Sequence, residues 1–297
     1  MAKRGNIAES KVDPFIVVIY TTLTLLAILI LAPFYNVVIV SFSPMVEYVR
    51  TPFLLFPQDP TLQNYRDLLS GGTIGIGYRS TALLVVIGVP INILLTTLTS
   101  YALCKNDLPG RRFFILYILI TMLFSGGVIP LYLVVRDLGL INSIWSVIWV
   151  GACNTFYLIL TRNYFLSLPA SLKESAHIDG ASELTIFFRI VLPLSLPIIA
   201  TVTLFVTVDK WNEWFYPLLF IHRSDIRPLQ VVLRNIINNA QITIAGSGQA
   251  LDQANAVRAV KGMQMAAIML TMGPIMCVYP FLQKHFNKGI MVGAIKA

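Results

Sequence analysis

The chain has 297 residues, of which 56% are hydrophobic and only 12% are charged. A soluble globular domain has about 25% charged residues, so this composition excludes a soluble enzyme and indicates an integral membrane protein. The net charge of +8 at pH 7 is explained better by basic cytoplasmic loops than by nucleic-acid binding. We therefore expect membrane lipid, and no nucleic acid, among its partners.

Six apolar stretches are long enough to cross a membrane, which takes about 20 helical residues. The first is too long for a removable signal peptide and lacks a small-residue cleavage site, so we expect a signal anchor with a cytoplasmic N-terminus. The sequence predicts an all-α membrane protein with six transmembrane helices in one domain over 15–283, between cytoplasmic tails at 1–14 and 284–297. The predicted spans are 15–42, 80–104, 113–135, 138–160, 190–208 and 262–283.

The short loops support this orientation. Lys105, Arg111 and Arg112 lie between the second and third spans, whereas Arg136 is the only basic residue between the third and fourth. Because lysines and arginines accumulate in cytoplasmic loops, the former loop is expected inside. The loop over 162–193 and the C-terminal tail then face the cytoplasm too.

Two of the outer loops are long. The first, over 43–79, contains several prolines, which favour an extended segment packed at the membrane surface. It ends in GGTIGIGYRS, which lacks the lysine of a phosphate-binding loop and is expected to lead flexibly into the second span. The last outer loop, over 209–261, includes AGSGQALDQANAVRA, a tract typical of a flexible loop with room for a short helix.

The sequence offers no catalytic or metal-binding constellation, so we expect no enzyme activity and no metal. Its histidines and cysteines have neither metal-ligand nor disulfide spacing. The apolar spans also lack the carboxylates with which ion-coupled carriers bind protons or sodium. Energy for uphill transport is therefore expected from another polypeptide, and a secondary carrier is the less favoured alternative. The residues concerned are His177, His222, His285, Cys104, Cys153 and Cys277.

A polar stretch, KESAHIDGASELTIFFRIVLP at 173–193, separates the fourth and fifth spans. Ser171 and Glu174 have the spacing of a capping box, which predicts a helix from about Leu172. Gly180 is expected to break that helix, because glycine is unfavourable in a helix interior. The pattern therefore predicts a helix, a turn and a second helix on the cytoplasmic surface. An ordinary interfacial helix explains the pattern alone equally well.

The second helix of this stretch is expected to be amphipathic and to run into the fifth span. Prolines close to the start of that span cost little there, because the first helical N–H groups have no intrahelical partner. The predicted apolar face consists of Leu184, Phe187, Phe188 and Val191, and the prolines are Pro193 and Pro197.

The spacing of the stretch resembles the EAA loop of permease subunits in bacterial ATP-binding-cassette (ABC) importers, E-A-A-x3-G-x9-I-x-L-P. Ser175 departs from this pattern by standing where alanine is usual. Four further stretches resemble the maltose-type carbohydrate permeases, in particular the branch associated with complex oligosaccharides. They are FSGGVIPLYLVVRDLGLINSIW at 124–145, KWNEWFYPL at 210–218, RPLQVVLR at 227–234 and YPFLQKHFNKGIMVGAIKA at 279–297.

This resemblance covers nearly the whole chain and implies a type I ABC importer permease fold with a cytoplasmic coupling helix. It implies a non-catalytic subunit of the bacterial cell membrane that forms half of a translocation path for a sugar or oligosaccharide. The implied partners are a second homologous permease in a heterodimer, two cytosolic ATPase subunits and an extracellular solute-binding protein. ATP and Mg would bind to the ATPase subunits, with no cofactor on this chain. A permease for a non-sugar solute is the main alternative within transport.

The resemblance also implies which residues contact the ATPase. Glu174 would supply a charged contact, and Gly180 would allow a close approach, while Leu184, Phe187 and Phe188 would pack the second helix onto the bundle. A frayed polar tail is the alternative for the C-terminal group. The implied contacts are Glu174, Ser175, Ala176, Asp179, Gly180 and Ala181 in the EAA loop, and Lys288, Gly289 and Gly293 in the C-terminal tail.

Candidate cargo residues surround the outer end of the fifth span, in TVDKWNEWFYP. Aromatic rings stack on the C–H face of a pyranose and amides bind its hydroxyls, although the aromatics fit an interfacial belt as well. Asp209 and Lys210 stand where the resembled family usually has uncharged residues. If the helix continues past Val208, both are expected to face a water-filled cavity, because charged groups at membrane depth are costly. The candidates are Trp211, Asn212, Trp214 and Tyr216.

Small residues in the third span have two interpretations. Ser125, Gly126, Gly127 and Pro130 either bend the helix or let another helix approach closely, and the second is favoured because small residues are common at such contacts. The last outer loop has six basic and four acidic residues. This difference is too small to choose between a neutral and an acidic saccharide.

Overall fold

The computed structural model describes residues 14–44, 55–246 and 261–277. Within these ranges the chain is helical and contains no β-strand. It divides into two compact units, Met1–Arg66 with Thr243–Met269 and Asp67–Ile242 with Leu270–Ala297. The predicted C-terminal tail lies outside the described residues, as does all but the last residue of the N-terminal tail.

Helix α1 (Pro14–Phe42) belongs to the first unit and corresponds to the first predicted span. Its 29 residues extend about 43 Å, which exceeds the roughly 30 Å hydrocarbon core of a bilayer. Side chains are exposed around the whole helix up to Tyr35, as expected where lipid is the solvent. Its last turn is held by Tyr65, whose hydroxyl donates to Ser41 Oγ at 2.8 Å, and by Asn64, whose Nδ2 donates to the Ser41 carbonyl at 3.1 Å.

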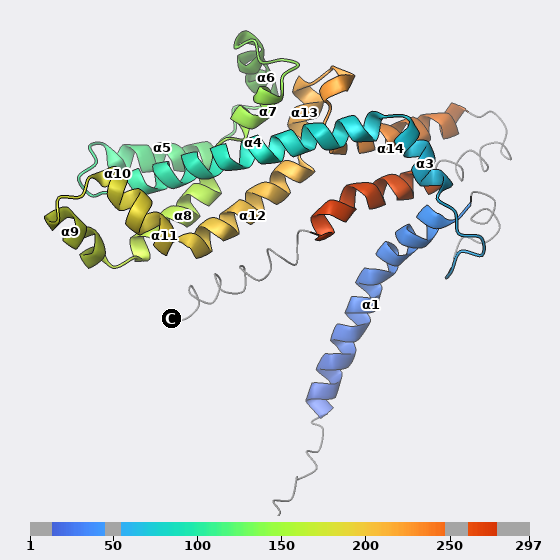
Figure 1. Cartoon of the computed structure of the whole chain (residues 1–297), viewed down its shortest axis with the longest axis horizontal. Coiled ribbons are helices and arrows are strands. Elements are labelled where there is room, and N and C mark those ends of the chain that lie inside the picture. Colours follow the sequence, from blue (N-terminus) through green and yellow to red (C-terminus); the bar gives the residue numbers. More distant parts are fainter. Residues whose placement is uncertain (1–13, 45–54, 247–260, 278–297) are drawn as a thin grey trace, which may run out of the picture. The chain divides into compact units, whose positions relative to one another are not determined.

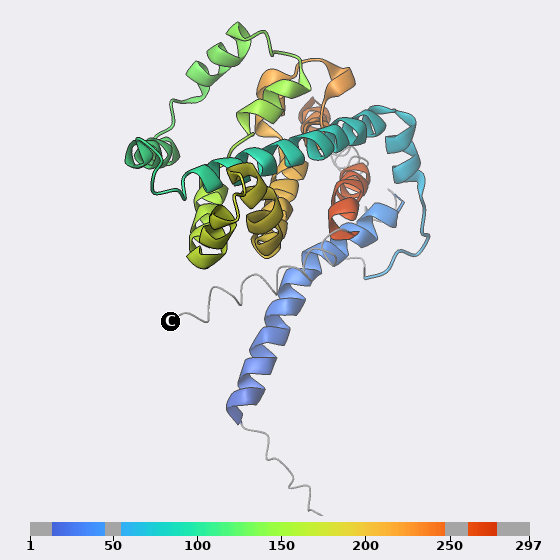
Figure 2. The same cartoon turned by 60° about the vertical axis from the view of Figure 1, so that its left-hand side comes forward.

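Helix α4 (Thr73–Ala102) is the centre of the second unit. It packs against α7 (Ile144–Val150), α8 (Thr155–Ser167) and α12 (Leu196–Asn212), and α12 lies next to it (Figures 1 and 2). The contacts bury Leu84 and Val89 of α4 together with Val147, Ile148, Val202 and Val206. The buried hydroxyl of Ser100 on α4 is paired, since its Oγ donates to the Leu158 carbonyl at 2.9 Å. The buried clusters of the unit are therefore arranged around one long helix.

The start of α4 corrects one prediction. GGTIGIGYRS was expected to be a flexible lead, but Thr73 and the residues after it form the first turns of the helix. Gly72 precedes them with a φ of +67°, a conformation that glycine adopts without strain. Gly77 lies against Leu229, because a Cβ at Gly77 would be 3.0 Å from the Leu229 Cα. These glycines thus serve a turn and a close packing contact.

The third and fourth predicted spans are broken. Helix α5 (Arg111–Leu123) and α6 (Val128–Asp137) meet at 115°, and α7 and α8 meet at 48°. Gly127 has a φ of +92° at the first break, and nothing lies within 4 Å of a Cβ built on Gly126. At these small residues the chain therefore bends, and no described residue packs against Gly126, contrary to the favoured interpretation.

The fifth predicted span is bent as well. The segment Glu183–Leu194 meets α12 at 81°, and the bend lies at Ser195. Pro193 and Pro197 lie in the first turns of α11 (Leu192–Leu194) and α12, as predicted. Helices α1 and α4 are each long and apolar enough to span a membrane, and with the three bent pairs the described residues supply up to five spans. The sixth predicted span is helical over 261–277, and its remainder lies outside the described residues.

The two long loops that we predicted to lie outside contain helices that the sequence did not indicate. The first includes α3 (Gln63–Ser70), where an extended segment was expected. The last includes α13 (Phe215–Phe220), the 3₁₀ turn η2 (Ser224–Ile226) and α14 (Leu229–Gly246). Leu229, Val231 and Val232 are buried, so tertiary packing stabilises α14. Most of the tract AGSGQALDQANAVRA lies outside the described residues.

Candidate functional site

The EAA loop begins with α9 (Ala170–Ile178), two residues before the predicted start. The predicted capping box was wrong, because Ser171 lies inside the helix and Pro169 occupies the N-cap without a side-chain hydrogen bond. Pro169 has an extended ψ of 127° and cannot donate a backbone hydrogen bond, so the helix starts directly after it. Glu174 is exposed on this helix.

Gly180 ends α9 in a Schellman motif. The sequence predicted that this glycine would break the helix, and the structure confirms it. Its φ is +76°, and its N–H donates to the His177 carbonyl at 3.0 Å. The N–H of Ala181 reaches back to the Ala176 carbonyl, also at 3.0 Å. This pair of bonds satisfies the last carbonyls of the helix and requires a left-handed residue between them. Nothing lies within 4 Å of a Cβ built on Gly180, so the backbone rather than crowding selects glycine.

The second helix of the loop has a different buried face from the predicted one. Helix α10 (Glu183–Ile186) passes into a π-helical turn, Phe187–Val191. Phe187 and Val191 are buried as predicted, but Leu184 and Phe188 are 64% and 51% exposed. A π turn has more residues per turn than an α-helix, so it rotates the side chains away from the 3.6-residue pattern.

An apolar cluster attaches this loop to α4 and α8 at the end of α4 that lies beside α10 (Figure 1). Phe187 is fully buried, and its ring centroid lies 5.1 Å from that of Tyr101. Together the contacts join the loop to α4 and α8. The buried members are Tyr101, Cys104, Phe165, Ala176, Ile186, Phe187 and Val191.

Glu183 adds a polar attachment that sequence reasoning missed. Tyr101 donates to its Oε2 at 2.8 Å, Lys105 forms an ion pair with it, and His177 Nε2 lies 3.2 Å from its Oε1. Burial raises the pKa of the Glu183 carboxyl, but the hydrogen bonds from Lys105 and Tyr101 and the neighbouring charges lower it more, so the pKa lies below its ordinary value. Glu183 thus connects the loop to the α4–α5 connection that holds Lys105.

We expect Glu183→Gln to reduce the loss of stability in acid. Because the folded-state pKa is lowered, the ion pair stabilises the fold above the ordinary value of 4.5, and this contribution disappears as the pH falls through the lowered pKa. The side chain is 42% exposed, so we expect a contribution below about 1 kcal/mol. Thermal unfolding followed from pH 7 to below the lowered pKa should show a smaller drop for Glu183→Gln than for the wild type. The exposed control Asp59→Asn should follow the wild type, and identical profiles for all three would contradict the assignment.

The remaining surface of the loop is exposed and partly apolar. Of the predicted contacts, Ala176 is buried and Ala181 is half-buried, and the other four are exposed. Large apolar side chains stand among them, and Ile178 is 86% exposed. Such a patch suits a protein partner better than water. The exposed residues are Glu174, Ser175, Asp179 and Gly180, with Leu172, Ile178, Leu184 and Phe188 beside them.

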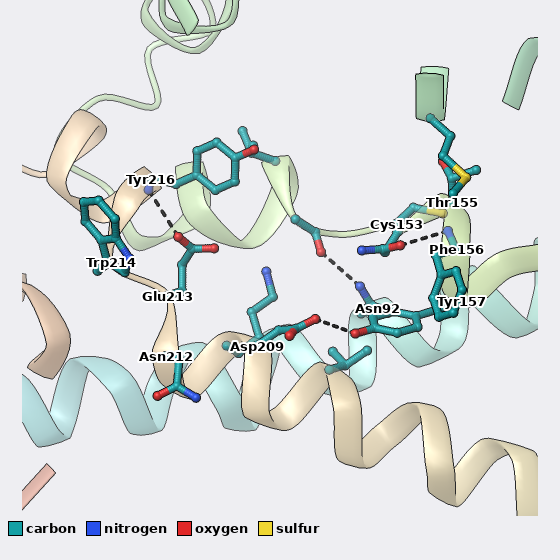
Figure 3. Close-up of a pocket in the computed structure, with 16 residues that line it drawn as sticks. Asn92, Cys153, Thr155, Phe156, Tyr157, Asp209, Asn212, Glu213, Trp214 and Tyr216 are labelled. Carbon is teal, nitrogen blue, oxygen red and sulfur yellow. Dashed lines mark hydrogen bonds between the residues drawn. The ribbon is translucent and has the colours of Figure 1, made fainter. Parts of the chain in front are cut away.

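A cavity of about 680 Å³ opens at the other candidate region, where α12 ends beside the α7–α8 break (Figure 3). Helix α12 continues past Val208 to Asn212. Asp209 and Lys210 were expected to face a cavity in that case, and both line this one. The wall combines aromatic rings, amides and charges. It includes Asn92, Cys153, Asn154, Tyr157, Asp209, Lys210, Asn212, Glu213, Trp214 and Tyr216.

The polar groups of the wall are ordered by hydrogen bonds that Figure 3 shows as dashed lines. Asn92 Nδ2 donates to the Gly151 carbonyl at 2.9 Å, and Tyr157 Oη donates to Asp209 Oδ2 at 2.7 Å. Glu213 accepts from the backbone N–H of Tyr216 at 3.2 Å, so it caps the start of α13. The side chains are thereby held in place before any ligand arrives.

Three of the four cargo candidates line this cavity, namely Asn212, Trp214 and Tyr216. Trp211 is not among the lining residues, because its Nε1 donates to the Thr271 carbonyl at 3.1 Å and its ring lies 6.3 Å from that of Tyr78. The predicted ATPase contacts in the C-terminal tail, Lys288, Gly289 and Gly293, lie outside the described residues. Sequence spacing did not find Asn92 and Tyr157, which come from distant helices.

Apolar bent helices around a polar cavity, with an exposed loop fastened to them, are the architecture of a membrane transport protein. Residues 3–292 match the family of binding-protein-dependent transport system inner membrane components. The chain belongs to this family and is a permease subunit of an ABC importer, located in the membrane.

Individual relatives agree with this assignment. The polygalacturonan/rhamnogalacturonan transport system permease protein YtcP of Bacillus subtilis is 40% identical over 95% of this chain and 98% of its own length. Protein LplC of the same organism is 41% identical over 89% of this chain and 88% of its own. A chain in the crystal structure of a bacterial ABC transporter involved in the import of the acidic polysaccharide alginate has a TM-score of 0.82 and 30% identity, and the match covers 92% of this chain and 96% of that one. The type I permease fold predicted from the sequence is thus confirmed.

Proposed function

We propose that this chain forms one half of the translocation path of a carbohydrate ABC importer, paired with a second, homologous permease. The observation that carries the proposal is the cavity at the end of α12, in which Trp214 and Tyr216 stand beside amides and carboxylates. Aromatic faces and convergent hydrogen-bonding groups suit a saccharide, which has apolar C–H faces and hydroxyl edges. The transport of saccharides by YtcP and by the alginate importer supports this substrate class.

The EAA loop is proposed to dock on a cytosolic ATPase, one of two such subunits that hold ATP and Mg. Its exposed residues, with Glu174 and Asp179 beside Ile178, offer charged and apolar contacts on one small surface. Because Phe187 and Glu183 fasten the loop to α4 and α8, movement of the ATPase would be transmitted to the membrane helices. An extracellular binding protein would deliver the cargo, and both termini would lie in the cytoplasm.

The two tryptophans of KWNEW allow a matched test of the cavity. We expect Trp214→Ala to raise the apparent KM for oligosaccharide uptake by about tenfold, since an aromatic face at a binding site is worth at least about 1.4 kcal/mol. Trp211→Ala should instead lower thermal stability with little change in KM, because Trp211 packs against Tyr78 and Thr271. The assay is ATP-dependent uptake into vesicles that contain both permeases and the ATPase, with the binding protein outside.

Two results would contradict the proposal. An unchanged KM for Trp214→Ala, with normal assembly, would remove the cavity from the cargo path. Uptake driven by an ion gradient, without the ATPase, would instead identify a secondary carrier.

A further inference from the structure

Lys210 is a buried cation in the wall of the cavity. Lys210 is only 5% exposed, and its Nζ donates to the Val147 carbonyl at 3.3 Å. Two glycines make room for it. A Cβ on Gly88 would lie 3.6 Å from Lys210 Cε, and a Cβ on Gly151 would collide with Nζ. Residues from α4, the end of α7 and α12 therefore combine to accommodate a lysine at this place.

The charge of Lys210 is not neutralised by a direct ion pair. An ammonium group has three N–H donors, and the described ranges provide one hydrogen-bond acceptor for it, the Val147 carbonyl. None of the ion pairs in the described part of the chain includes Lys210. Asp209 and Glu213 of the same cavity wall attract this charge without forming an ion pair with it. A buried charge that lacks a direct ion pair is unfavourable, and charged groups in membrane proteins mark substrate or ion paths. An anionic group in the cavity would complete the environment of this lysine.

The two carboxylates of the cavity wall already accept hydrogen bonds elsewhere. Asp209 accepts from Tyr157 Oη at 2.7 Å, and Glu213 Oε1 accepts from the backbone of Phe215 and Tyr216 at 3.1 and 3.2 Å. These bonds orient both groups, and each carboxylate still has lone pairs with which to accept a hydroxyl hydrogen. The cavity wall thus combines one positively charged hydrogen-bond donor, Lys210, with two carboxylate acceptors.

We propose that Lys210 is a specificity-determining residue that binds the carboxylate of an acidic oligosaccharide built of uronate units. The sugar hydroxyls would donate to Asp209 and Glu213, and Trp214 would cover an apolar sugar face. This inference rests on the proposed function and narrows it from saccharides in general to acidic ones. A lysine that only stabilises the carbonyl end of α7 is the competing explanation, since cations are favourable at helix C-termini.

The test compares trigalacturonate with its methyl ester, which has the same ring and no charge. Equilibrium binding is measured on the complete transporter in lipid nanodiscs without the binding protein, so that the permeases alone select the ligand. We expect the wild type to bind the acid at least about tenfold more tightly, the effect of one charge-assisted hydrogen bond. Lys210→Met should weaken binding of the acid by about the same factor and change binding of the ester by less than about twofold. The exposed control Arg136→Gln removes one positive charge outside the cavity and should leave both affinities unchanged.

Several outcomes would overturn the inference. Equal wild-type affinity for acid and ester decides against it without any variant, which matters if Lys210→Met does not assemble. Equal weakening of both ligands by Lys210→Met would show a structural role. A transporter that binds and imports only neutral oligosaccharides would refute this inference and leave the proposed function standing, whereas one that imports no saccharide would refute the proposed function itself.

Discussion

Gly180→Arg should abolish most ATP-dependent uptake while leaving the subunit in the membrane. Gly180 has a φ of +76° in an exposed Schellman turn, where any other L-residue costs about 1–2 kcal/mol. Space around its Cβ is open, so the arginine projects from the loop without disturbing the core. On the proposed docking surface, that bulk would separate the loop from the ATPase. We expect uptake to fall by more than about tenfold, equivalent to at least 1.4 kcal/mol of docking free energy.

Gly139 provides a matched control for this variant. It has a φ of +70°, open space around its Cβ, and the same pair of backbone bonds, from Gly139 to Arg136 and from Leu140 to Val135. Gly139→Arg therefore introduces the same strain and bulk at the end of α6, away from the EAA loop. It should retain most uptake, with ATPase activity still stimulated by the loaded binding protein. Equal losses in both variants would attribute the effect of Gly180→Arg to backbone strain and remove the case for docking.

Phe187→Ala should cause the largest loss of stability in the loop. The ring is fully buried against Tyr101 and Phe165, and truncating such a phenylalanine costs about 3–5 kcal/mol. The thermal midpoint of the purified subunit should fall by roughly 10 °C, as followed by tryptophan fluorescence. Because Phe187 joins the loop to α4 and α8, uptake should fall together with stability.

A Phe188→Ala variant tests whether the loss of stability comes from burial of the ring rather than from the loss of any aromatic side chain. Phe188 is 51% exposed, so Phe188→Ala should change stability by less than about 0.5 kcal/mol. Any loss of uptake in that variant would then come from the docking surface. If Phe188→Ala destabilised the protein as much as Phe187→Ala, the π turn would not define the buried face.

The broad architecture was predictable because its signals are local. A membrane span requires a long apolar stretch, which can be counted in the sequence, and 15–42 corresponds closely to α1. The turn at Gly180 was predictable for the same reason, since a glycine after a helical segment suits a left-handed cap. The EAA spacing was found because all of its residues lie within twenty positions of one another.

Breaks and buried faces were not predictable in the same way. A run of apolar residues at 113–135 looks the same whether its helix is straight or bent by 115° at Gly127. The face of 184–191 depends on a π turn that carries Phe187 into a pocket formed by α4 and α8. The helical period alone therefore placed Leu184 and Phe188 on the wrong side.

By itself, the sequence determined the class of protein, the order of its apolar segments and the coupling-loop motif, since each depends on residues close together along the chain. Only the tertiary structure decided which polar residues share a cavity. Asn92, Tyr157 and Lys210 lie on three different helices, and Gly88 of α4 and Gly151 at the end of α7 make room for the lysine. Their proximity follows from how α4, α8 and α12 pack, which is a property of all three helices together.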